Sequence, residues 1–218
     1  MVAGAEMRVG GAADAWRIGL LCFFVTMFEG FDLQIIGVLA PGIGRELALT
    51  PVALGGVFGA ATLGLLCGAL VSGFLADRIG RKPTLVVSIA VFAAFTWATS
   101  LAQTADQLAL ARLLTGVGLG GAMPSIAAIA SEAVGRKNNI AFVTIMFAGM
   151  PFGGALSALA VALWPGEVSW RAVFEIGGGA QVALSLVIVA FMPESREFLR
   201  GREGTQEKGA ISPEPVIS

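Results

Sequence analysis

The sequence has no histidine, only two cysteines and few charged residues. The lack of histidine excludes histidine-ligated metal sites, Ser-His-Asp hydrolysis and histidine proton relays. Cys22 and Cys67 both lie inside apolar stretches, which does not suit a disulfide framework. Only 13% of the 218 residues are charged and 56% are hydrophobic, which lies outside the usual range of soluble domains. We therefore expect a membrane protein that is not an enzyme, with no metal, no cofactor and no nucleic-acid partner.

Long apolar runs and 30 glycines fill most of the chain, and its mean hydropathy is +0.83. A helix needs about 20 mostly apolar residues to cross the hydrocarbon layer of a bilayer. Six segments meet this requirement: 19–40, 52–76, 83–103, 107–130, 139–164 and 170–192. The sequence predicts an all-α membrane protein with a six-helix bundle over 19–192. Residues 1–18 form an amino-terminal segment, and the polar residues 193–218 form a disordered linker or tail.

Lysine and arginine are distributed unevenly between the two ends of these spans. Only Arg45 and Arg171 lie in or beside the first, third and fifth connections, and Arg112 lies within a span. Because positive charge gathers on the cytoplasmic side, both termini should be cytoplasmic, in a bacterial inner membrane. The other eleven basic residues all lie on that side: Arg8, Arg17, Arg78, Arg81, Lys82, Arg136, Lys137, Arg196, Arg200, Arg202 and Lys208.

The connection between the second and third spans reads G-x-x-x-D-R-x-G-R-K over residues 73–82. We expect the glycine to pack one helix end, the aspartate to end that helix, and the basic residues to make a tight cytoplasmic turn. A basic cytoplasmic loop can occur in any membrane protein, but the full spacing of this motif resembles the signature loop of the major facilitator superfamily. The resemblance implies the amino-terminal six-helix half of a two-half carrier, with these residues as its gating loop: Gly73, Asp77, Arg78, Gly80, Arg81 and Lys82.

Two further segments narrow the resemblance. The run Glu-Gly-Phe-Asp-Leu-Gln at 29–34 resembles the acidic first-helix motif of the aromatic acid:proton symporters, and 111–121 with 131–133 is similar to 3-(3-hydroxyphenyl)propionate transporters. The resemblance implies proton-coupled import of an aromatic carboxylic acid, such as a hydroxyphenylpropionate or a hydroxybenzoate. Nothing resembles the superfamily's second half, so a missing half or a second copy in a homodimer would be needed. A truncated, non-transporting membrane protein and a carrier of another organic anion remain alternatives.

Three ionisable residues lie within the predicted spans, where an unpaired charge costs several kcal/mol. Glu29 and Asp32 are three residues apart and share a helix face, and Arg112 falls at a depth similar to that of Asp32. We expect the three to meet in a water-filled cavity. Glu29 and Asp32 are the candidate proton-coupling residues, and Arg112, Gln34 and Asp32 are the candidate substrate-binding residues. A fixed Asp32–Arg112 pair that serves only assembly is the alternative.

Glycine and proline spacing adds expectations about packing. The pairs 55/59, 64/68 and 149/153 have the spacing that lets helices approach closely. Pro151 should kink the fifth span. Glu175 follows Arg171 by one turn, which predicts a pair along one helix.

Overall fold

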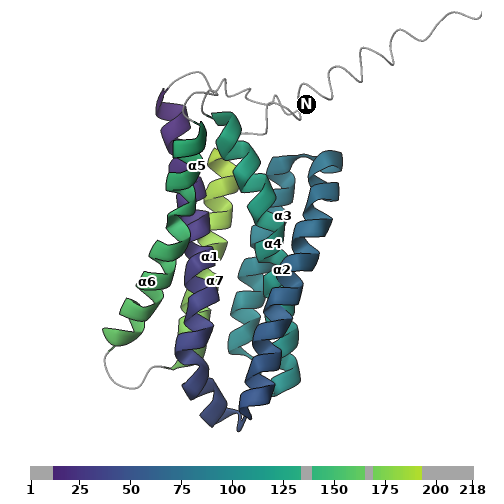
Figure 1. Ribbon diagram of the computed structural model, residues 1–218, viewed down its shortest axis with the longest axis vertical. Helices are drawn as coiled ribbons and strands as arrows, with labels where there is room; N and C mark the ends of the chain where they lie inside the picture. Colours follow the sequence, from purple (N-terminus) through teal and green to yellow (C-terminus); the bar gives the residue numbers. More distant parts are fainter. Residues whose placement is uncertain (1–11, 134–138, 165–168, 193–218) are drawn as a thin grey trace, which may run out of the picture.

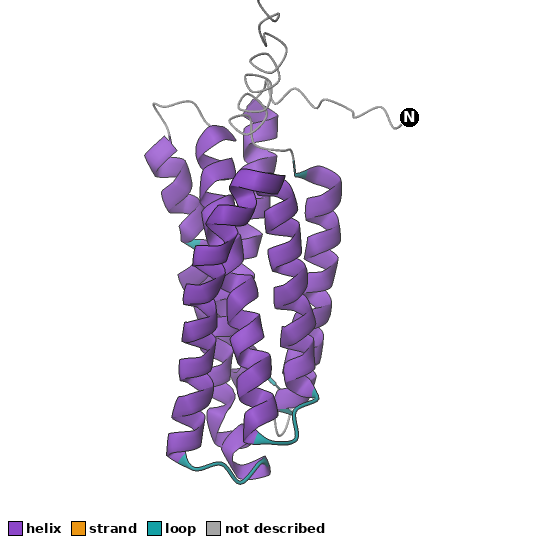
Figure 2. Ribbon diagram, turned by 90° about the vertical axis from the view of Figure 1, so that its right-hand side faces the viewer, coloured by secondary structure: helices purple, strands orange, loops and turns teal. Residues whose placement is uncertain are grey.

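The computed structural model describes residues 12–133, 139–164 and 169–192. Within these ranges the chain forms helices and no strand (Figure 1), so the predicted all-α fold is confirmed. Six of the helical segments are long and apolar enough to cross a membrane, with α5 and α6 together making the fifth. They run side by side along the long axis of the bundle (Figure 2). The helices are α1 (Ala12–Glu46), α2 (Pro51–Ile79), α3 (Arg81–Ser100), α4 (Ala105–Ala133), α5 (Asn139–Phe147), α6 (Gly149–Ala162) and α7 (Trp170–Phe191).

The helix ends differ from the predicted spans because helices continue beyond the apolar core of each run. α1 begins before residue 19 and passes through Pro41 to end at Glu46. A proline inside a membrane helix is tolerated where neighbours satisfy the freed backbone groups. α2 continues past Asp77 to Ile79, so the expectation that this aspartate ends the helix is wrong. Residues 1–11 and 193–218, which contain the predicted tail, lie outside the described residues.

A single residue, Gly80, connects α2 to α3. Its φ of 109° is a backbone conformation that favours glycine. The Gly80 N–H donates to the Ala76 carbonyl at 3.1 Å, and the Thr84 hydroxyl donates to the Gly80 carbonyl at 2.7 Å. We use Gly80 to name this end of the bundle and Glu46 to name the opposite end.

The fifth span is interrupted where the proline predicted a kink. The helix breaks at Ala148, between α5 and α6. Because Pro151 has no N–H, the helical hydrogen-bond ladder is incomplete at this point. The Thr26 hydroxyl of α1 donates to the Met146 carbonyl at 2.7 Å, so a side chain from a neighbouring helix satisfies one backbone acceptor beside the break.

Glycines set the closest helix contacts. A Cβ added to Gly64 or Gly68 of α2 would lie 1.9 or 2.1 Å from a carbonyl oxygen of α4, and one added to Gly120 of α4 would lie 1.9 Å from a carbonyl of α2. Gly149 and Gly153 of α6 contact α1 in the same way. These two predicted glycine pairs therefore pack as expected. The pair at 55/59 does not, since no atom of a neighbouring element in the described part of the chain lies within 4 Å of a Cβ added at either position.

Two apolar clusters fill the bundle, one toward each end. The cluster at the Gly80 end includes Cys22, Leu85 and Ile188, and the cluster at the Glu46 end includes Ile36 and Phe174. Both draw on α1, α4 and α7, and the cluster at the Gly80 end also draws on α3. Buried polar side chains lie between these clusters, and they form the candidate site.

Candidate functional site

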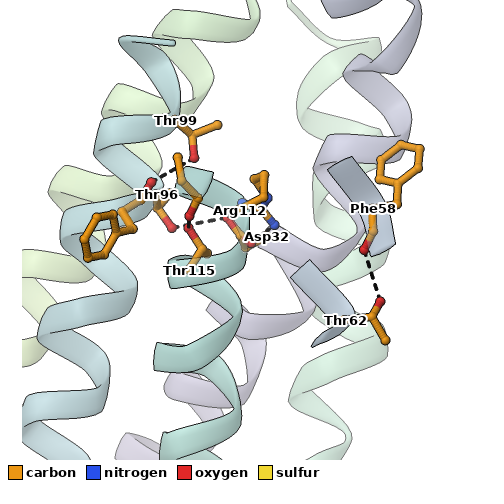
Figure 3. A network of polar contacts seen from close by, with 9 residues as sticks. Asp32, Phe58, Thr62, Thr96, Thr99, Arg112 and Thr115 are labelled. Carbon is orange, nitrogen blue, oxygen red and sulfur yellow. Dashed lines mark hydrogen bonds and ion pairs between the residues drawn. The ribbon is translucent and has the colours of Figure 1, made fainter. Parts of the chain in front are cut away.

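Asp32 of α1 and Arg112 of α4 form a two-pronged ion pair in the core (Figure 3). Arg112 Nη1 donates to Asp32 Oδ1 at 3.1 Å, and Nη2 donates to Oδ2 at 2.6 Å. The two side chains are only 1% and 2% exposed. A planar guanidinium matches a carboxylate in this geometry, which gives direction as well as attraction. The sequence-based expectation that these two residues meet is therefore confirmed.

Two further residues complete the surroundings of the pair. The Thr96 hydroxyl of α3 donates to Asp32 Oδ1 at 3.3 Å. The Arg112 guanidinium carbon lies 5.7 Å from the centre of the Phe174 ring of α7, within cation–π range. Arg112 Nε has no hydrogen-bond partner among the residues that the structure describes. Sequence reasoning did not assign Thr96 or Phe174 to the site, since neither carries a charge.

Glu29 lies one turn from Asp32 on the same face of α1 and is 0% exposed. Within the described part of the chain, neither of its carboxyl oxygens has a hydrogen-bond partner. Burying an unpaired carboxylate in an apolar medium is so costly that such groups neutralise instead. The neutral, protonated form of Glu29 is therefore the one that fits this position.

The predicted water-filled cavity is absent at these three residues, because Glu29, Asp32 and Arg112 are all buried. Packing by α3 and α7 closes over the pair, and this part of the expectation is wrong. Gln34, also predicted to bind substrate, does not join the cluster. It is exposed and lies against Gly154 of α6.

The predicted gating loop divides into exposed and packed residues. Asp77 and Arg78 are exposed, and Gly73 has nothing within 4 Å, so its expected packing is wrong within this bundle. Arg81 instead forms an ion pair with Glu132, which joins the start of α3 to the end of α4. From the sequence we assign Glu132 no partner. Its position at the end of the fourth span, on the same side of the bundle as Arg81, could have indicated this ion pair. Lys82 is half-buried.

A second polar cluster lies at the Glu46 end. Glu46 accepts hydrogen bonds from Trp170 Nε1 at 2.7 Å and from Arg171 Nε at 2.9 Å. Arg171 also donates to the Ser100 carbonyl, which joins α1, α3 and α7. The predicted Arg171–Glu175 pair is therefore wrong, because among the described residues Arg171 pairs with Glu46 of α1 instead. Among the described residues, no group of three cysteines, aspartates or glutamates could hold a metal ion.

The sequence is similar to several aromatic acid transporters. It is 43% identical to the "3-(3-hydroxy-phenyl)propionate transporter" of Escherichia coli (strain K12) over 178 residues, which cover 82% of this chain and 44% of the relative. It is 38% identical to the "4-hydroxybenzoate transporter PcaK" of Pseudomonas putida, covering 91% of this chain and 45% of the relative. The chain thus spans about half the length of these relatives and matches their amino-terminal half.

Solved structures with the same fold are also transporters. The proton:xylose symporter XylE, bound to 6-bromo-6-deoxy-D-glucose, superposes with a TM-score of 0.78 at 18% identity, over 88% of this chain and 48% of that one. A bacterial homologue of the lysosomal transporter Spinster gives a TM-score of 0.69 at 19% identity, over 85% of this chain and 44% of that one. At these identities the likeness shows the fold alone. Residues 22–217 match the family model of the Major Facilitator Superfamily, and the chain belongs to that superfamily.

Proposed function

We propose that this chain is the amino-terminal half of a proton-driven importer of aromatic carboxylic acids. It would lie in a bacterial inner membrane with both termini in the cytoplasm, as the distribution of lysine and arginine favours. The named activities of the relatives support an aromatic acid as substrate. The single observation that carries the mechanism is a buried Asp32–Arg112 pair one helical turn from a buried carboxyl group without a partner.

Arg112 is the group that recognises the substrate in this proposal. Its guanidinium already holds one carboxylate, that of Asp32, in a two-pronged arrangement. A substrate carboxylate has the same shape and charge and competes for the same two N–H groups. The Phe174 ring beside the guanidinium adds an aromatic face on which a substrate ring can pack. The site therefore suits an anion with an aromatic body.

Protonation of Asp32 is the step that frees Arg112. With the pair closed, the site holds one positive and one negative charge, and there is no room for a second anion without a large electrostatic cost. When Asp32 takes up a proton, the substrate carboxylate replaces it and the net charge of the site stays the same. Glu29, held neutral one turn away, gives its proton to Asp32 and takes up another from the outside solution, so it is neutral again when the substrate anion is bound. One proton then accompanies each substrate anion.

The buried position of the pair means that binding requires the bundle to open, and this requires a second six-helix unit. In the superfamily, substrate sites lie between two halves that rock against each other. Several glycines along α1 and α2 have open space beside them, including Gly37, Gly55, Gly59 and Gly73, and these faces are available to the second unit. The exposed Gln34 lies on the same helix as Asp32 and is a candidate substrate contact from that side.

Uptake by reconstituted protein tests the proposal. The chain is incorporated into liposomes alone and together with the carboxyl-terminal half of the Escherichia coli relative, and labelled 3-(3-hydroxyphenyl)propionate and 4-hydroxybenzoate are supplied outside. We expect uptake with the second half present, and we expect it to rise when the outside is more acidic than the inside. Labelled xylose serves as the control solute.

Two results would contradict the proposal. If helical, correctly inserted protein gives no uptake in either arrangement, the chain is a non-transporting membrane protein. If uptake occurs but is indifferent to the pH gradient, proton coupling is wrong while aromatic acid transport stands. Uptake of a non-aromatic carboxylate at the same rate would favour a carrier of other organic anions.

A further inference from the structure

Gln181 of α7 is a second buried polar side chain whose hydrogen bonding is incomplete. It is 1% exposed, and its Oε1 atom has no hydrogen-bond partner within the described ranges. A buried amide oxygen left without a donor is destabilising. Gln181 lies in the mostly apolar stretch of α7 that follows Glu175, where glutamine has no packing advantage over leucine or methionine, so the position calls for a functional explanation.

Gln181 and Glu29 occupy equivalent places on two antiparallel helices. Glu29 is midway between Cys22 and Ile36 on the buried face of α1. Gln181 is midway between Ile188 and Phe174 on the buried face of α7. Cys22 and Ile188 belong to the cluster at the Gly80 end, and Ile36 and Phe174 belong to the cluster at the Glu46 end. Between these shared clusters, Glu29 and Gln181 fall at the same depth.

Two contacts, one near each end of α1 and α7, give a second measure of which residues of the two helices lie at the same depth. At the Gly80 end, Arg17 of α1 lies over the Phe191 ring of α7 at 5.7 Å. At the Glu46 end, Trp170 Nε1 donates to Glu46. The midpoint of these two contacts places Gln181 opposite the stretch of α1 between Glu29 and Asp32, and within that stretch Asp32 is already engaged with Arg112. The two side chains thus lie in one stretch of the core, each lacking a partner.

We propose that Gln181 positions the proton-carrying carboxyl group of Glu29, by accepting a hydrogen bond from its protonated form at Oε1. In the conformation of the present structure neither group bonds the other, and rotation of the two flexible side chains joins them. A protonated carboxyl group has one O–H donor, and the amide oxygen is an acceptor, so the pair is complementary. When Glu29 gives up its proton, the amide can turn and donate an N–H to the carboxylate. Gln181 can therefore satisfy both protonation states.

Few other groups can take this role. The ionisable side chains that face Glu29 are Asp32 and Arg112, which are engaged with each other, and Cys22 two turns away on α1. α5 and α6 contain no ionisable side chain. On α2, α3, α4 and α7, apart from Arg112 and the exposed Cys67 of α2, the ionisable residues lie near the helix ends. Gln181 supplies a hydrogen-bonding partner at this depth without adding a charge.

This inference rests on the proposed proton-coupled function, but its test does not require transport. Infrared spectra of the full chain in liposomes are recorded across a pH series. The carbonyl band of a protonated carboxyl group is assigned to Glu29 by its loss in Glu29→Gln. We expect Gln181→Met to shift this band to higher wavenumber, because the hydrogen bond from the carboxyl group is lost. Ser125→Ala is the matched control, since Ser125 Oγ is also buried without a partner but belongs to the Gly80-end region of α4, and the band should stay in place.

Each outcome separates the two proposals. A band that does not move in Gln181→Met overturns the role of Gln181 and leaves the proposed transport intact. No Glu29 band at any pH overturns both. A shifted band in a protein that shows no uptake supports Gln181 and overturns transport alone. If Gln181→Met does not fold, Gln181→Asn replaces it. Its shorter side chain keeps the amide but lengthens the bond, so the band should shift in the same direction by a smaller amount.

Discussion

The seam between α2 and α4 and the contact between α1 and α4 hold the same bundle together in opposite ways. In the seam, glycines such as Gly64 and Gly120 bring backbone against backbone, and no side chain could be inserted. Between α1 and α4, the Asp32–Arg112 ion pair spans the gap with two long side chains. The seam depends on close van der Waals packing, which has no second arrangement of similar energy. In the proposed mechanism, the ion pair depends on one proton and Asp32 can be exchanged for a substrate carboxylate.

The two contacts indicate which parts of the molecule would move in the proposed transport cycle. α2, α3 and α4 form a unit fixed by glycine contacts, since Gly118 of α4 also lies against the backbone of α3. α1 and α6 form a second such unit through Gly30 and Gly153. The ion pair joins the two units, and Glu29 and Gln181 lie in the core beside it. In the proposed mechanism, a change of protonation at this junction therefore loosens one unit from the other without disturbing either.

The largest expected effect comes from a side chain inserted into the seam. Gly64→Leu places its Cβ on the Leu113 carbonyl, 1.9 Å away in the present geometry, so α2 must separate from α4. Overpacking a well-packed core costs about 1–3 kcal/mol and occasionally more, and because a backbone obstacle cannot rotate aside, we expect this change to cost more than breaking the buried ion pair. Thermal unfolding in detergent measures the loss. Gly59→Leu on the same helix is the matched control, because nothing lies within 4 Å of Gly59. Equal destabilisation by Gly64→Leu and Gly59→Leu would show that close glycine packing between α2 and α4 does not determine the stability of the bundle.

The second largest effect comes from breaking the ion pair on one side. Asp32→Leu leaves the Arg112 guanidinium buried without its carboxylate, which costs about 3–5 kcal/mol when one partner of a buried pair is removed. The double variant Asp32→Leu with Arg112→Leu should recover most of this loss, because no charge remains. Equilibrium unfolding of the two single variants and the double variant gives the coupling free energy. An additive double variant would show that the pair contributes nothing to stability.

Much of the fold and part of the site could be predicted from the sequence. Six apolar runs fix six helices, and the depth of Asp32 and Arg112 within their runs predicts that they meet. The burial of that pair could not be predicted, because membrane helices are apolar on all sides and their sequences do not show which face meets a neighbour. Phe174 and Thr96 were missed for the same reason. The glycine pair at 55/59, which contacts no neighbouring helix in the described part of the chain, has the same spacing as the pairs at 64/68 and 149/153, which do. The spacing alone therefore does not show which pair packs against a neighbour.

A smaller effect on stability is expected at Glu29, although it lies one turn from Asp32. Glu29→Gln replaces a neutral carboxyl group with a neutral amide of nearly the same shape, so it should change the free energy of unfolding by less than about 1 kcal/mol. Proton-coupled uptake, measured as described above, should be lost, because an amide cannot carry the proton. A strong loss of stability would indicate that Glu29 is ionised and paired in the folded protein, which contradicts the proposed proton donor.

The smallest effect is expected where an ion pair is exposed. Glu46→Gln removes the charge that holds Arg171, but the Glu46 side chain is 49% exposed. Water and salt screen such pairs, which typically contribute about 0.2–1 kcal/mol. The loss should shrink further as salt is added, whereas the cost of Asp32→Leu should not, because ions do not reach the core. Unfolding of both variants at low and high salt tests this difference. If the two respond to salt alike, the Asp32–Arg112 pair is wetter than its burial indicates, and a carrier that loads protons from an open cavity becomes the better description.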